Sequence, residues 1–262
     1  MNPIAIIAGF LLLASAGVAC AQDTPAPASP PTENDGTDPT SPAKFAKVSF
    51  EHLDLALPDG LPGDNSNSLI FEYQQPFGHN AIKLKLPIVS VDALGNNDYA
   101  LGDASVKLTH VLTVTKTHGI ILNGEIVFDT ASRPELGTGK TVIKPGITTA
   151  FFLKGGHIFA PAFVQSLSIA GDDNRADINS STVDFYFVPK LANPKLYMTL
   201  DPAVTHDWKN DKTFLVTALT LGYKLGPMLG GRGQIFVKPS IGIGSNSPTG
   251  WGVSTGFQLL SF

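Results

Sequence analysis

Charged side chains recur at every second position inside otherwise apolar stretches of this sequence. Lys83 and Lys85 alternate with Ile82 and Leu84, so a β-strand would carry the two ammonium groups on one face and the aliphatic side chains on the other. The same alternation groups a set of charged and tyrosine side chains on one face: Glu72, Lys83, Lys85, Glu125, Asp129, Lys144, Asp184, Tyr186, Lys195, Tyr197, Asp201 and Lys238. Such a set can form ion pairs that fill an interior, or line a watery path whose field selects solutes. The tyrosines would offer ring faces to aromatic solutes.

Nucleophilic catalysis is a second chemistry to consider. Gly252–Gly256 matches the G-x-S-x-G nucleophile elbow, which needs a strand-to-helix turn with a histidine and an acid nearby. No helical pattern follows Ser254, so we expect no elbow there. A barrel enzyme that modifies lipid would bring Ser, His and an acid together at its wall, with His110 or His206 as the base. That reading stays open as an alternative, and we expect no enzyme.

Metal binding is the third chemistry to consider. The stretch 172–179 is rich in carboxylate and amide side chains, but it lacks the glycine and distal glutamate of an EF-hand loop. A solvated loop with an ion pair between Arg175 and an aspartate is the favoured interpretation. The histidines show no H-x-x-x-H or H-E-x-x-H spacing; they are His52, His79, His110, His118, His157 and His206. We therefore expect no metal site and no cofactor.

Composition favours an all-β chain of a membrane. Of the 262 residues 43% are hydrophobic and only 15% are charged, whereas about a quarter are charged in typical soluble domains. The net charge of −4 gives no basic surface for nucleic acid. The single cysteine excludes an internal disulfide framework.

The N-terminus has the pattern of an export signal. An apolar run over 4–19 precedes Ala19-Cys20-Ala21, which predicts a secretory signal peptide over 1–21 that is removed. An uncleaved anchor helix, or a lipid attached to Cys20, are the alternatives. Residues 22–44 are rich in Pro, Ala, Ser and Thr and predict a disordered tether. The alternative is that this segment folds back into a pore.

From Phe45 onward the chain reads as a ladder of strands. The strand-like segments are 45–57, 66–77, 80–91, 103–117, 119–131, 141–153, 156–170, 180–190, 194–206, 212–223, 232–243 and 250–262. Longer polar connections alternate with mostly tight turns, as in bacterial outer-membrane barrels. Residues 45–262 thus predict a transmembrane antiparallel up-and-down β-barrel of twelve strands, or of ten if 45–57 and a neighbour are not strands. Prolines within these segments predict bulges or strand ends. A soluble, lipid-anchored periplasmic β-domain that binds a ligand is the opposing interpretation.

The C-terminus bears on assembly. Barrel strands of this class typically end in Phe with apolar residues on the same face, and such an ending would engage the barrel-assembly machinery. Phe262 is terminal, but the apolar face of the last strand consists of Trp251, Val253, Phe257 and Leu259. Phe262 is therefore out of register unless a bulge near Leu260 corrects it.

Three stretches carry a family resemblance: SIAGDDNRADINSSTVDFYFVPKL (168–191), LGTGKTVIKPGITTAF (136–151) and GWGVSTGFQLL (250–260). Together they resemble the outer-membrane transporter family associated with bacterial meta-cleavage phenol degradation, over roughly residues 66–260. The resemblance implies a barrel in outer-membrane lipid that takes part in the movement of small organic, including aromatic, compounds. The sequence therefore predicts a passive channel in a Gram-negative outer membrane.

Overall fold

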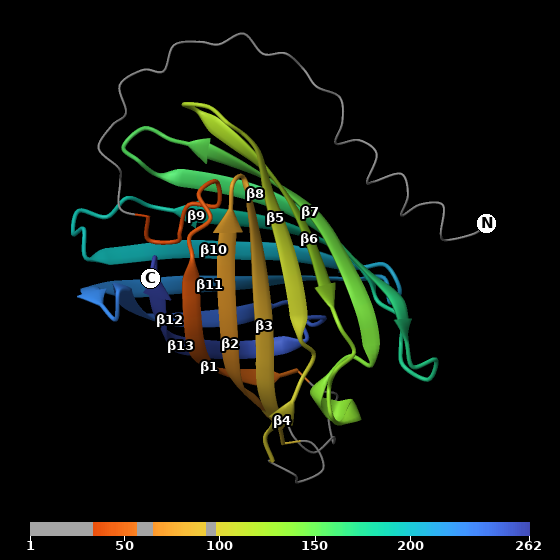
Figure 1. Cartoon of the computed structure of the whole chain (residues 1–262). Helices are drawn as coiled ribbons and strands as arrows, with labels where there is room; N and C mark the ends of the chain where they lie inside the picture. The colour runs from red at the N-terminus through yellow and green to blue at the C-terminus, as the bar shows by residue number, and fades with distance from the viewer. Residues whose placement is uncertain (1–33, 57–64, 93–97) are drawn as a thin grey trace. The chain divides into compact units, whose positions relative to one another are not determined.

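The computed structural model of the protein describes residues 34–56, 65–92 and 98–262 (Figure 1). The predicted signal peptide (1–21) and residues 22–33 of the predicted tether lie outside these ranges. Within them, no helix has both the length and the apolar character needed to cross a membrane.

Nearly all of the regular structure in these ranges is strand. The elements are β1 (Phe45–Leu55), β2 (Asn65–Phe77), β3 (Asn80–Val91), β4 (Ala100–Leu101), β5 (Ser105–Val114), β6 (His118–Val127), the short 3-10 helix η3 (Pro134–Leu136), β7 (Lys140–Phe152), β8 (Ile158–Gly171), β9 (Asn179–Val188), β10 (Leu196–Asp207), β11 (Lys212–Met228), β12 (Gly231–Ile243) and β13 (Thr249–Leu260).

The long strands form one closed antiparallel sheet. Each pairs with its neighbours in chain order, and β1 closes the ring by pairing with both β2 and β13. The two-residue β4 only extends the edge of β3. In the described part of the chain the barrel thus has twelve long strands, as predicted, and β1 is one of them.

The two faces of the wall differ in chemistry. On β2, Phe71 is 42% exposed while its neighbours Ile70 and Glu72 are 7% and 9% exposed. The buried face is the inner face, because Glu72 there contacts lysines of both adjacent strands. The outer face carries aliphatic and aromatic side chains that remain exposed, as expected where the neighbour is hydrocarbon.

The connections are on average shorter at one end of the barrel than at the other. The end with the shorter average consists of 78–79, 115–117, 153–157, 189–195 and 229–230, and we call it the short-turn end. Left-handed backbone at Gly78 (φ 58°) and Gly230 (φ 76°) makes two of these turns. The other connections, which include the segment with β4 and the one with η3, lie at the opposite, long-loop end (Figure 1).

Of the two predicted roles of the prolines, strand ends hold for Pro76 and Pro189, which lie at the ends of β2 and β9, but the prolines do not mark the bulges. The register shifts fall between Leu53 and Leu55, Val111 and Thr113, Thr141 and Val142, and Lys224 and Gly226. Pro202 instead lies where pairing between β9 and β10 is interrupted, while its ladder with β11 is continuous. A strand can keep one ladder across a proline because the ring removes only one donor.

The last residues bring Phe262 to the outer face without a bulge near Leu260 in β13. β13 ends at Leu260, which is buried on the inner face. Ser261 then adopts a left-handed conformation (φ 54°) and its N–H donates to the carbonyl of Lys44. This reverses the face, so that Phe262 lies beside the exposed Tyr73, with ring centroids 6.5 Å apart.

Candidate functional site: the charged lumen

The inner face of β1, β2 and β3 carries a three-residue ion cluster. Glu72 accepts from Lys83 at 3.0 Å and forms a second ion pair with Lys47. Lys85 follows on the same face of β3, opposite Glu72 and Ser105 in the register. The carboxylate side chain of Glu72 is only 8% exposed, so its charge depends on both lysines.

The charged wall continues over β5, β6 and β7. Lys107, Glu125 and Lys144 face one another across these strands. The Ser105 hydroxyl donates to Glu125 at 2.7 Å. Lys83 and Lys107 are direct cross-strand partners, a juxtaposition of like charges that costs stability unless an anion lies near.

The opposite wall is more acidic. Asp184 on β9 lies beside Asp201 on β10, and Lys238 of β12 pairs with Asp201 at 3.5 Å. Tyr186 is on the same face and donates its hydroxyl to the carbonyl of Thr37 at 3.1 Å. Tyr197 packs against Gly222 of β11, where an added Cβ would come within 2.0 Å of its ring.

Two of the expected wall residues lie outside the strands. β6 ends at Val127, so Asp129 is an exposed loop residue at the long-loop end. β10 begins at Leu196, so Lys195 is an exposed turn residue at the short-turn end. Period-two alternation carries no information about where a strand stops, and the prediction for both residues depends on alternation alone.

A segment ahead of β1 enters the lumen at the short-turn end. We call residues 34–44 the inner segment (Figure 1). Two successive Asp-x-Thr turns give it shape: Asp35 accepts from the hydroxyl of Thr37 at 2.6 Å, and Asp38 accepts from the N–H and hydroxyl of Thr40, both at 2.8 Å. Within the described residues, 34–44 therefore follow the alternative in which the segment folds back into the pore.

Side chains from widely separated strands hold the inner segment. An ion pair joins its Asp35 to Lys224 of β11 at 2.8 Å. Four inner-face side chains donate to its carbonyls: Arg232 to Asn34, Gln234 to Asp35, Tyr186 to Thr37 and Gln74 to Ala43, at 2.8–3.3 Å. Because these donors come from β2, β9 and β12, the segment crosses the lumen rather than following one wall.

The environment of Asp35 keeps it ionised. Its partial burial alone would raise the pKa of the carboxyl, but hydrogen bonds from Lys224 and Thr37, with the charge of Lys224, lower the pKa below its ordinary value of 3.8. The ion pair with Lys224 is therefore formed throughout the neutral pH range.

Several interior residues were not found from the sequence. Lys107 sits within a correctly predicted strand and keeps its alternation, so the pattern could have found it. Lys47 lies in a strand whose mixed pattern hid its face. The D-G-T and D-P-T tripeptides of the inner segment are recognisable turn sequences, and they were the available signal of order there.

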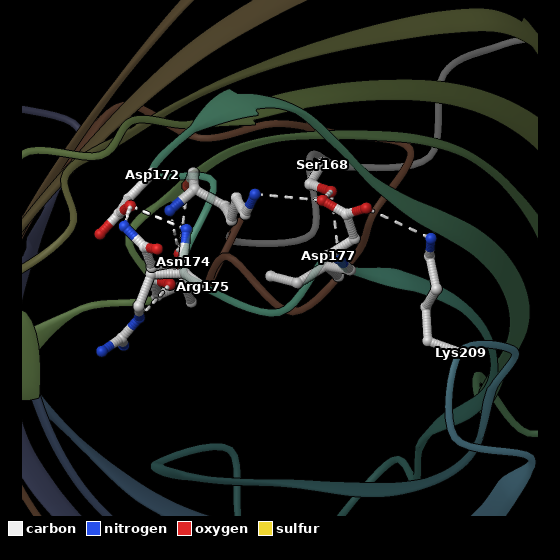
Figure 2. Close-up of polar contacts among 9 residues, drawn as sticks. Ser168, Asp172, Asn174, Arg175, Asp177 and Lys209 are labelled. Carbon is white, nitrogen blue, oxygen red and sulfur yellow. Dashed lines mark hydrogen bonds and ion pairs between the residues drawn. The ribbon is translucent and has the colours of Figure 1, made fainter.

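The long-loop end carries a polar network that joins four connections, which we call the loop clasp: Asp103, Gly137, Thr138, Lys140, Ser168, Arg175, Asp177 and Lys209. Asp177 pairs with Lys140 at 3.1 Å and with Lys209 at 3.3 Å, as Figure 2 shows for Lys209. These two lysines hold the pKa of the Asp177 carboxyl below its usual range. Asp103 accepts the N–H of Thr138 at 2.7 Å.

Arg175 does not form the expected ion pair with an aspartate. Its guanidinium donates to the carbonyls of Gly137 at 2.8 Å and Thr138 at 3.2 Å. Asp172 accepts instead from the N–H and side-chain amide of Asn174 at 2.9 Å. Two of the stretches that carry the family resemblance thus meet here. Among the described residues no group of His, Cys, Asp and Glu is placed to hold a metal ion.

The histidines considered as bases have other partners. His110 contacts the Asn80 side chain at 2.8 Å. His206 contacts Thr213 at 2.9 Å and lies edge-on against Trp208. Ser254 lies inside β13, opposite Lys238 and Glu51. The described residues therefore hold none of these histidines against Ser254.

Comparison with solved structures agrees with this architecture. An outer membrane channel from Pseudomonas putida F1 superimposes with a TM-score of 0.64 at 11% identity, covering 84% of this chain and 95% of that one. The NanC porin superimposes with a TM-score of 0.56 at 8% identity, covering 84% and 100%.

The chain has the fold of outer-membrane channels. At these identities the likeness extends to the fold alone, and no family model and no curated protein matches the sequence. Within this fold, the inner face carries the charged walls and the inner segment, and the outer face carries the apolar side chains.

Proposed function

We propose that the chain is a passive channel of a Gram-negative outer membrane that admits small organic solutes through its charged lumen. The single observation that carries this proposal is the division of one closed wall into two faces. Ionised side chains pair across the inner face, while exposed aliphatic and aromatic side chains cover the outer face. This division suits a hydrocarbon exterior and a wet interior.

The inner segment limits what passes. It crosses the short-turn end and is held from several strands, so a solute must pass beside it or displace it. Porins with open aqueous channels generally have about 16–18 strands. A twelve-stranded barrel with a segment across its lumen therefore favours small solutes.

The resemblance to the outer-membrane transporter family of meta-cleavage phenol degradation supports aromatic compounds as one solute class. Both Tyr186 and Tyr197 lie on the inner face, but Tyr197 is buried, so Tyr186, which is partly exposed, offers the ring surface to such solutes. In the cell we place the short-turn end in the periplasm, as is general for bacterial barrels. The outward Phe262 then supports recognition of the last strand by the barrel-assembly machinery.

Liposome swelling tests the proposal. Proteoliposomes with the full chain are challenged with a pentose, a disaccharide and phenol, and protein-free liposomes are the control. We expect swelling with the small solutes and slower swelling with the disaccharide. Rates equal to those of protein-free liposomes for every solute would remove the channel function.

A further inference from the structure

The lumen contains a cavity between the inner segment and the wall of β2, β3, β5, β6 and β7. Its volume is about 210 Å3. Lys83, Lys107, Asn123 and Thr109 line the wall side, and Asp38 and Pro42 line the segment side. Sites for drug-sized ligands span about 300–1,000 Å3, so this cavity suits a smaller molecule.

The charge that faces this cavity is not balanced by pairing. Lys83 shares the single carboxylate of Glu72 with Lys47, so Glu72 compensates only one of these two lysines. Lys107 forms no ion pair within the described part of the chain, and its cross-strand neighbour Glu125 accepts from Ser105. Lys107 is half-buried, and a partly buried ammonium that lies opposite another lysine is stabilised by a bound anion.

The remaining lining gives the cavity two kinds of surface. Asn123 and Thr109 share a hydrogen bond at 3.1 Å and extend the polar side next to the lysines. Ile121, Pro39 and Pro42 supply the apolar side. An occupant that has one anionic end and an apolar body matches both surfaces.

Asp38 limits the charge of that occupant. One of its carboxylate oxygens accepts both hydrogen bonds from Thr40, which orients the carboxylate within the segment. Two lysines and one aspartate leave the lining with a single excess positive charge. A monoanion compensates it, whereas a dianion would be repelled by Asp38.

We propose that this cavity binds a small monocarboxylate with an apolar body, with Lys107 as the main anion-binding residue and Lys83 beside it. The inference rests on the proposed function, since it makes the cavity a binding site along the path of the solute through the channel. It adds a preference for organic monoanions, which the channel proposal does not require.

Calorimetric titration of the full chain in detergent tests the site with benzoate as the probe. Benzamide is the uncharged counterpart, phthalate the dianion and chloride the inorganic anion. We expect benzoate to bind and the other three to bind at least about tenfold more weakly, since a charge-assisted hydrogen bond is worth that factor or more. Equal binding of benzamide or chloride would overturn the proposal.

Substitutions test which lysine binds the carboxylate of benzoate. Lys107→Gln should weaken benzoate binding about tenfold, and Lys107→Arg should restore it. Lys85→Gln is the matched control, because Lys85 is an inner-face lysine of β3 that does not line the cavity; it should leave binding unchanged. Equal losses in Lys107→Gln and Lys85→Gln would refute the assignment.

A measurement on the unmodified chain covers the case in which Lys107→Gln does not fold. Acetylation of the Lys107 amine, followed by mass spectrometry, should be slowed by benzoate and not by benzamide; absence of protection would overturn the site. Swelling with a neutral pentose is measured in parallel. Pentose flux without benzoate binding would refute this inference alone, whereas absence of pentose flux would refute the channel.

Discussion

Replacement of Lys224 by Met should loosen the inner segment. Lys224 provides the ion pair to Asp35, and each of these side chains is 23% exposed. Hydrogen bonds to charged groups contribute about 1.5–3 kcal/mol, and partial exposure brings this pair to about 1–1.5 kcal/mol. Because about 1.4 kcal/mol corresponds to a factor of ten, the fraction of time that the segment is displaced should rise roughly tenfold.

Single-channel recording in planar bilayers measures that fraction. The expected result is more frequent high-conductance openings in Lys224→Met than in the unmodified chain. Lys238→Met is the matched control, because Lys238 is also an inner-face lysine in an ion pair, with Asp201, but does not contact the segment. A chain that lacks residues 34–43 should be permanently open. If that deletion left the conductance unchanged, the inner segment would not constrict the lumen and the reasoning would fail.

Three further predictions concern pH, the loops and the C-terminus. Because the pKa of Asp35 is depressed, its ion pair stabilises the closed state above the ordinary carboxyl pKa and is lost as pH falls through the lower folded-state value. The open probability should therefore be flat from about pH 7 to 5 and rise below about pH 4. A rise that begins near pH 6 would contradict this. Gly171→Ala places a Cβ 2.3 Å from the carbonyl oxygen of Gly139, and the backbone φ of Gly171 is 130°. The substitution should lower the free energy of unfolding of the barrel in urea by about 1–3 kcal/mol. Gly124→Ala is the control, since the space around its Cβ is open, and it should leave this free energy unchanged. Phe262→Ala removes the aromatic contact with Tyr73 and should reduce the amount of folded barrel in the outer membrane, as measured by heat-modifiable mobility; normal assembly would exclude a role for Phe262.

The strand ladder was predictable because it depends on local signals. Alternation of apolar and charged residues places Lys83 and Glu72 on one face without any knowledge of their neighbours. The alternation of mostly longer polar connections with mostly tight turns then favours an outer-membrane barrel over a soluble sandwich. Strand ends depend on hydrogen bonds to partners far away in sequence, and for this reason Asp129 and Lys195 were assigned to strands that stop before reaching them.

The inner segment was harder to predict because its stability comes from contacts with distant residues. Its composition is that of a disordered linker, and no apolar periodicity marks residues 34–44. The side chains that hold it, among them Gln74 and Lys224, lie on separate strands whose inner faces meet only once the barrel closes. Arg175 shows the same limit, since its partners are backbone carbonyls that no sequence pattern reveals.

The account depends on which face of the wall meets lipid, and site-directed spin labelling measures this most directly. Nitroxide labels at position 184 and at its neighbour 185, in a Cys20→Ser background, are compared in proteoliposomes for collisions with oxygen and with a water-soluble nickel complex. We expect the label at Phe185 to collide mainly with oxygen and the label at Asp184 mainly with the nickel complex. The reverse result, or a label at 185 that is open to the nickel complex, would contradict a membrane-spanning barrel with a wet lumen.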